Sequence, residues 1–219
     1  MSTDQAQQPV DHGFFKSVSN DVSHLHMYWK IYRQLYAHGE QRVALLNETG
    51  PMVFYVLQHL LLDEVTLAIC RLTDPPTTGR KENHSLERLV AGVKEKELSE
   101  KLLATMERIQ ELARPFRERR NRAIAHTDLE TKLKLESNPL PGISREMVEK
   151  ALEQIRALMN AYDLHFFKNT TLYEEVILPL GADGDFLSEQ LRRAVAFRDL
   201  ERKGEINREL WTHGRYKDA

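Results

Sequence analysis

Five arginines and one histidine lie close together in the segment RPFRERRNRAIAHTD, residues 114–128. A guanidinium group binds phosphate through two parallel hydrogen bonds and stays charged at every physiological pH. An imidazole whose pKa lies near neutrality removes or donates a proton. Together these groups suit metal-independent cleavage of RNA, because the ribose 2′-OH supplies the nucleophile and the protein has only to position the phosphate and stabilise its charge.

Within this segment, Arg120, Asn121 and then His126 after four intervening residues resemble the motif of HEPN-fold ribonucleases. Two further segments, LDEVTLAICRLTD (62–74) and NHSLERLV (83–90), are similar to the abortive-infection U-type, or AbiU2-like, branch of that family. The chain is therefore identified by resemblance as a HEPN-type protein.

The resemblance covers roughly residues 20–170 and implies both a fold and an activity. It implies an all-α bundle that forms a homodimer, with two motifs facing one cleft. It also implies cleavage of RNA without a metal ion or other cofactor. The setting would be a toxin–antitoxin or phage-defence system, so that RNA, a second copy of the chain and an antitoxin protein are the expected partners.

A role for each motif residue also follows from the resemblance. His126 would act as general base or acid on the 2′-OH or the leaving oxygen. Arg120 would stabilise the phosphate, and Asn121 would orient His126 or the scissile group. The product would carry a 2′,3′-cyclic phosphate. The neighbouring arginines expected to bind phosphate or RNA are Arg117, Arg119 and Arg122.

Helical geometry favours a slightly different set of residues. On one continuous α-helix, Arg120 and His126 point roughly 120° apart. Arg119 and Arg122 precede His126 by seven and four residues, and so lie nearer its face. The long arginine side chain, or a partner subunit across the cleft, would reconcile the two assignments.

Two alternatives to catalysis remain open from the sequence. The arginines could form a solvated helix face paired with Glu107, Glu111 and Glu118, while His126 caps the helix end. The chain could also be a non-catalytic HEPN-type module that binds RNA or a protein. Such a module would keep the basic cleft but would not cleave RNA.

The other ionisable residues do not suggest a metal site. His24 and His26 are two apart, which places them on opposite sides of a helix. His59 is better suited to a buried hydrogen-bonded cluster with Asp63 or Glu64 than to metal binding. Further acidic and basic residues on that helix predict a buried ion-pair network or, alternatively, partners for the arginine cluster. They are Asp63, Glu64, Arg71 and Asp74.

Helical periodicity dominates the chain and predicts an all-α fold. Pro115 is expected to kink the helix that carries the arginines or to start a new one. The segment 51–73 is apolar on most of its circumference, so we expect it to be the buried central helix. The remaining predicted helices cover residues 20–39, 85–93, 99–114, 144–167 and 186–204, and residues 40–50 form either a short helix or a continuation of the first one past a kink.

Composition fits a globular protein of 219 residues, with 41% hydrophobic and 29% charged residues and a net charge of −2. We expect a HEPN-like bundle over residues 1–170, its first 15 or so residues frayed, and a C-terminal helical extension over 171–219. The single cysteine, Cys70, lies in an apolar run and is expected in the core. No signal peptide or uninterrupted membrane span is evident, which predicts a cytoplasmic protein.

Overall fold

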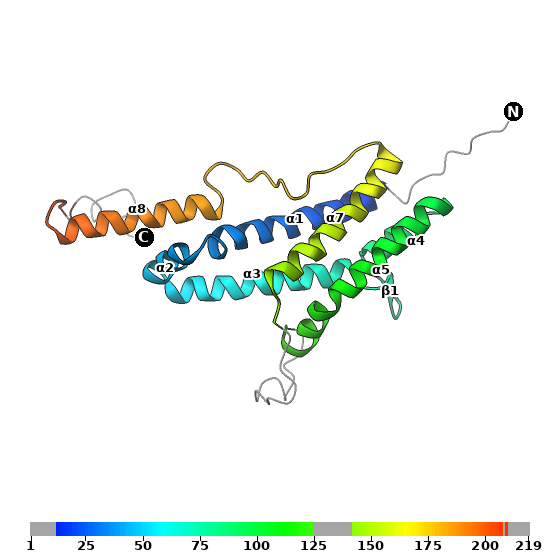
Figure 1. Cartoon of the computed structure of the whole chain (residues 1–219), viewed down its shortest axis with the longest axis horizontal. Helices are drawn as coiled ribbons and strands as arrows, with labels where there is room; N and C mark the ends of the chain where they lie inside the picture. Colours follow the sequence, from blue (N-terminus) through cyan, green and yellow to red (C-terminus); the bar gives the residue numbers. More distant parts are fainter. Residues whose placement is uncertain (1–11, 125–141, 208, 210–219) are drawn as a thin grey trace. The chain divides into compact units, whose positions relative to one another are not determined.

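A computed structural model of the chain describes residues 12–124, 142–207 and 209. The expected all-α architecture is confirmed, with one two-stranded antiparallel hairpin after the third helix (Figure 1). The elements are α1 (His12–Tyr36), α2 (Glu40–Thr49), α3 (Pro51–Leu72), β1 (Thr77–Thr78), β2 (Lys81–Glu82), α4 (Leu86–Ala91), α5 (Lys96–Arg119), the π-helical turn η1 (Arg120–Ile124), α7 (Arg145–Phe167) and α8 (Gly184–Arg202).

The chain forms two compact units. Among the described residues, the first unit comprises 12–29, 61–124 and 142–176, and the second comprises 30–60, 177–207 and 209. The division near residue 176 lies close to the expected start of the C-terminal extension. However, the second unit also includes the end of α1, all of α2 and the start of α3.

The core of the first unit is built where α5 packs against α7, which lie side by side in Figure 1. Apolar residues recur every three or four positions on both helices, so that each presents one continuous apolar stripe. In α5 the buried residues are Leu98, Leu102, Met106, Ile109, Ala113 and Phe116. In α7 they are Val148, Ala151, Leu152, Ile155, Leu158, Met159, Tyr162 and Asp163.

Helix α1 contributes aromatic contacts to the same core. The ring of Phe15 stacks on Tyr162 of α7, with centroids 5.2 Å apart. Trp29 is only 3% exposed, and its indole Nε1 donates to Glu149 Oε1 at 2.8 Å. This bond satisfies a donor that would otherwise be buried without a partner.

Helix α3 is not buried along its whole length, contrary to expectation. In its second half, which belongs to the first unit, Val65 and Ile69 are fully buried. In its first half, which belongs to the second unit, large apolar side chains such as Met52, Val53 and Leu60 are more than half exposed. Among the described residues, α3 is the one helix whose length and composition would allow a membrane span, a criterion that core helices of soluble proteins also meet.

The second unit packs α2 against α8 around Leu35, Leu46 and Phe54. A polar contact fixes the start of α8, where Gln34 Oε1 accepts from Gly184 N at 3.1 Å. A Cβ atom at Gly184 would lie 2.9 Å from Cβ of Gln34. Glycine is therefore required for this close approach.

Buried His26 makes the stability of the first unit depend on pH. It is 5% exposed and stacks on Tyr173, and its Nε2 has no hydrogen-bond partner among the described residues. Burial lowers the pKa of His26 to about 4; the charge of Arg156 adds to this shift and that of Glu174 opposes it. Between about pH 4 and pH 6.5, the imidazole of His26 is therefore protonated in the unfolded state but not in the native state.

We expect the free energy of unfolding to fall as the pH drops from about 6.5 to about 4, because only the unfolded state binds the proton there. The loss amounts to about 3 kcal/mol at most. Urea denaturation at pH 7 and at pH 4 measures it. His26→Leu should flatten this part of the pH profile, whereas His24→Leu, at an exposed position of the same helix, should leave it unchanged.

Candidate functional site

The arginine cluster lies at the end of α5, and Pro115 does not start a new helix. Helix α5 continues through Pro115 as far as Arg119. Ala113 and Phe116 are fully buried on either side of the proline, so packing offsets the local cost of its missing N–H.

The regular helix changes at Arg120 instead. Residues Arg120–Ile124 form the π-helical turn η1, in which hydrogen bonds run from residue i to i+5. Side-chain directions calculated for an α-helix therefore do not apply beyond Arg119. Turns of this kind occur often at functional sites.

Arg120 is held in a defined position by a carboxylate from another part of the chain. Its Nη1 donates to Asp74 Oδ1 at 2.9 Å and to Oδ2 at 3.3 Å, and its Nε donates to Asn121 Oδ1 at 3.2 Å. Its side chain is 24% exposed. Burial by itself lowers the pKa of Arg120, but the hydrogen bond and charge of Asp74, together with Cys70, raise it overall. The guanidinium is thus a fixed positive charge with part of its surface open.

Two of the neighbouring arginines are also paired with carboxylates. Arg119 Nη2 contacts Asp63 Oδ1 at 3.1 Å, while its buried Nε has no partner within the described part of the chain. Arg122 Nη1 contacts Glu118 Oε1, four residues earlier at the end of α5, at 3.0 Å. The positive charge of the cluster is therefore partly balanced by acidic side chains.

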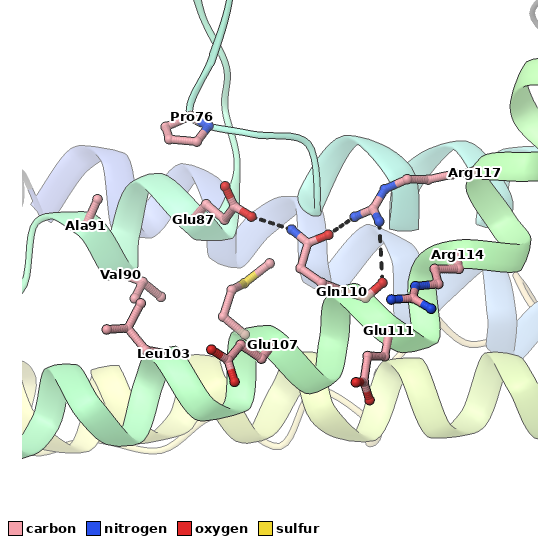
Figure 2. Close-up of a pocket in the computed structure, with 11 residues that line it drawn as sticks. Pro76, Glu87, Val90, Ala91, Leu103, Glu107, Gln110, Glu111, Arg114 and Arg117 are labelled. Atoms are coloured by element: carbon pink, nitrogen blue, oxygen red, sulfur yellow. Dashed lines mark hydrogen bonds between the residues drawn. The ribbon is translucent and has the colours of Figure 1, made fainter.

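Arg117 takes part in a polar network instead of an ion pair (Figure 2). Its Nη2 donates to the backbone oxygen of Thr73 at 3.0 Å and to the side-chain oxygen of Gln110. Gln110 Nε2 donates in turn to Glu87 and, at 2.9 Å, to the same Thr73 oxygen. This network ties α5 to α4 and to the end of α3.

The structure thus brings Arg117, Arg119 and Arg120 together against the second half of α3 and the residues that follow it, while the exposed Asn121 accepts a hydrogen bond from Arg120. Arg122 points instead along its own helix toward Glu118. His126 lies outside the described residues.

The acidic residues of α3 and of the segment that follows it make two kinds of contact. Asp63 and Asp74 lie beside the arginine cluster, which was one of the two alternatives predicted for them. Glu64 pairs with Arg71 on the same helix instead.

The predicted cluster of His59 with an acidic residue is wrong. His59 is exposed, and its Nδ1 contacts the backbone oxygen of Tyr55. The carboxylates that could have paired with it, Asp63 and Glu64, are engaged by arginines. In the described ranges, no group of three or more His, Cys, Asp or Glu side chains is arranged to hold a metal ion.

The position of Cys70 in the core is confirmed. Cys70 is fully buried, and burial raises the pKa of its thiol to about 11, a shift that the nearby charge of Arg120 partly opposes. The neutral thiol thus lies behind Arg120 as part of the apolar packing. It offers no reactive thiolate near neutral pH.

A protein-family model described as AbiU2, with the family name HEPN_AbiU2, matches residues 12–195. The match includes the arginine cluster and extends beyond residue 170 into α8. No curated protein and no solved structure matches the chain significantly.

Proposed function

The chain belongs to the AbiU2 family of HEPN proteins, and we propose on that basis that it is a metal-independent endoribonuclease. The observation that carries this proposal is the fixed guanidinium of Arg120, which is held by Asp74 and adjoins Asn121 in the π-helical turn. The family name suggests abortive infection. We therefore propose that the enzyme acts in the cytoplasm as a toxin or in defence against phage.

In the proposed reaction, His126 removes the proton from a ribose 2′-OH, and the 2′-oxygen attacks the adjacent phosphorus. The bond to the 5′-oxygen breaks, and this oxygen takes up a proton from water as it leaves, while the His126 imidazolium returns its proton to the solvent. The products are a 2′,3′-cyclic phosphate and a 5′-OH end. Arg120 stabilises the negative charge that accumulates on the phosphate, and Asn121 orients the imidazole or the scissile group.

The other arginines support binding of the RNA backbone in this proposal. Arg119 and Arg122 contact phosphates that flank the scissile one, in exchange with their carboxylate partners. Arg117 is already engaged by Thr73 and Gln110, so it contributes by holding the end of α5 in place. A homodimer, and inhibition by an antitoxin protein, complete the proposal by analogy with the family.

A non-catalytic RNA- or protein-binding HEPN module is the second candidate. The observation that favours it is the pairing of Arg119, Arg120 and Arg122 with carboxylates, which reduces the charge available to a phosphate. Such a module would bind RNA or a protein partner and leave the RNA intact.

The direct test is incubation of the purified chain with total RNA or tRNA in EDTA. We expect cleavage, with 2′,3′-cyclic phosphate ends on the products. An RNA with a 2′-deoxyribose at the cleavage position should resist, because it lacks the nucleophile. Binding without cleavage would favour the non-catalytic module.

Asp74→Asn should lower kcat for RNA cleavage by about tenfold to a hundredfold while KM changes little, because a misplaced reacting group costs about that much. The asparagine keeps the shape of the side chain but no longer holds Arg120 by its charge. Single-turnover kinetics measures the effect. Glu64→Gln, on a carboxylate that pairs with Arg71 instead, is the matched control and should not alter the rate. Faster cleavage by Asp74→Asn would show that Asp74 restrains Arg120 instead of positioning it.

A further inference from the structure

A pocket of about 660 Å³ opens beside the arginine cluster, between α4, α5 and the segment that follows α3 (Figure 2). One wall is apolar and includes Val90, Leu103 and Met106. Leu103 is 50% exposed, so a large apolar side chain is available to a ligand at the mouth. An apolar surface of this kind suits the face of a flat ring.

The opposite wall is polar and is held in place by the network around Gln110. The Glu87 carboxylate accepts from the side-chain nitrogen of Gln110, and the side-chain oxygen of Gln110 accepts from Arg117 (Figure 2). Because both ends of the Gln110 amide are engaged, its orientation is fixed. The carboxylate of Glu87 is therefore presented at a defined place, and Glu107 and Glu111 add two further carboxylates to the lining.

The charge of the lining favours a ligand that donates hydrogen bonds. It includes three carboxylates and two guanidinium groups, those of Arg114 and Arg117. A phosphate group would meet a net negative lining, whereas a neutral ring with N–H donors would find acceptors. The pocket is thus suited to a nucleobase, whereas the phosphate group would bind to Arg120.

The pocket and the catalytic motif are connected through consecutive residues. Arg117, which lines the pocket, donates to the Thr73 oxygen, and Arg120 donates to the Asp74 carboxylate. Thr73 and Asp74, the partners of the two arginines, are consecutive in the chain, so the two guanidinium groups are held beside neighbouring residues. A nucleotide with its phosphate at Arg120 would therefore have its neighbouring base close to the mouth of the pocket.

We propose that this pocket binds an unpaired guanine of the RNA substrate next to the scissile phosphate, an inference that rests on the proposed ribonuclease activity. Guanine alone among the four bases presents two adjacent donors, N1–H and N2–H₂, on its Watson–Crick edge. A carboxylate accepts both. Adenine, cytosine and uracil lack two adjacent donors on that edge, so a carboxylate that contacts two neighbouring positions of these bases would face at least one acceptor. Proteins that read single-stranded RNA commonly stack a base and bind this edge.

The first experiment measures binding of nucleotides to the full-length chain by calorimetry. GMP should bind about 5- to 150-fold more tightly than AMP, which is the usual discrimination by a bidentate contact to a base. Glu87→Gln should remove this preference, and Leu103→Arg, at an exposed position, should block the pocket. Glu100→Gln, on an exposed carboxylate of α5 outside the lining, is the matched control and should bind GMP normally. Equal binding of GMP and AMP, or GMP binding unaffected by both pocket variants, would overturn the proposal.

The second experiment compares cleavage positions in a single-stranded RNA pool of random sequence. Cleavage next to guanine by the native chain, lost in Glu87→Gln, would support the pocket. Cleavage without base preference that is unchanged in both pocket variants would overturn the pocket and leave the ribonuclease activity standing. If no RNA is cleaved but GMP is bound as described, the ribonuclease proposal fails and the guanine site is retained.

Discussion

Arg120→Ala will lower the rate of RNA cleavage by about 10²–10³-fold, the cost of removing one group that stabilises charge in a transition state. Arg120 makes its described contacts with Asp74 and Asn121 and is partly exposed, so the core should remain folded. Arg120→Lys should rescue little of the activity, because an ammonium group cannot reproduce the planar, two-pronged contact. Single-turnover cleavage assays in EDTA measure the rates of the native chain, Arg120→Ala and Arg120→Lys.

His126→Ala should reduce the same rate by about 10²–10⁴-fold through loss of proton transfer. The two substitutions together should cost less than the product of the single effects, because residues that act as a unit are not additive. Arg108→Ala, at an exposed arginine of α5, is the control and should cleave normally. Activity that survives in both Arg120→Ala and His126→Ala would assign the cleavage to another site or to a contaminating nuclease.

Phe116→Ala should lower the free energy of unfolding by about 3–5 kcal/mol, the usual cost of truncating a buried phenylalanine. Phe116 is fully buried between Pro115 and Arg117 and keeps the last turn of α5 against the core. Since whole domains are stable by only about 5–15 kcal/mol, this loss is a large fraction of the total. Urea denaturation followed by circular dichroism measures it.

Leu103→Ala provides the comparison for Phe116→Ala. Leu103 is on the same helix but half exposed, so its truncation should change stability by only about 0.5 kcal/mol. Equal losses at the two positions would contradict the assignment of Phe116 to the core.

The helices were predictable because most of them have a one-sided apolar pattern. The segment 144–167 is the clearest case: Ser144 caps α7 by accepting from Met147 N, and the helix ends at Phe167. Local sequence patterns predict the ends of other helices less well. Ser85 lies at the start of α4 but makes no capping bond through its side chain. Helix α1 begins at His12, before the predicted start at residue 20, because its apolar stripe extends back to Phe15.

The burial of α3 and the division into two units depend on tertiary contacts that periodicity does not encode. The sequence of an apolar segment does not indicate whether other helices cover that segment. Consequently the second half of α3 was correctly expected in the core, whereas the exposure of Met52 and Val53 was not.

The candidate site was predictable where its residues are neighbours in sequence. Arg120 and Asn121 follow from a local motif. The partner of Arg120, Asp74, is 46 positions away, and the sequence marked it only as one of several acidic residues on the preceding helix. The sequence does not predict the polar network of Glu87, Gln110 and Arg117. A glutamine and an arginine seven positions apart are common in a helix, and nothing local indicates that they contact each other. Of the two effects predicted for Pro115, the start of a new helix is wrong, since α5 continues through the proline to Arg119.

The π-helical turn at Arg120–Ile124 also bears on how this segment can evolve. Each hydrogen-bonded ring in such a turn contains one residue more than the ring of an α-helix. Insertion or deletion of a single codon therefore creates or removes the turn. Its removal would rotate every following residue by about 100° relative to α5. A one-codon change of length can thus alter the direction of the downstream chain while α5, and with it the anchoring of the helix by Phe116, keeps its place.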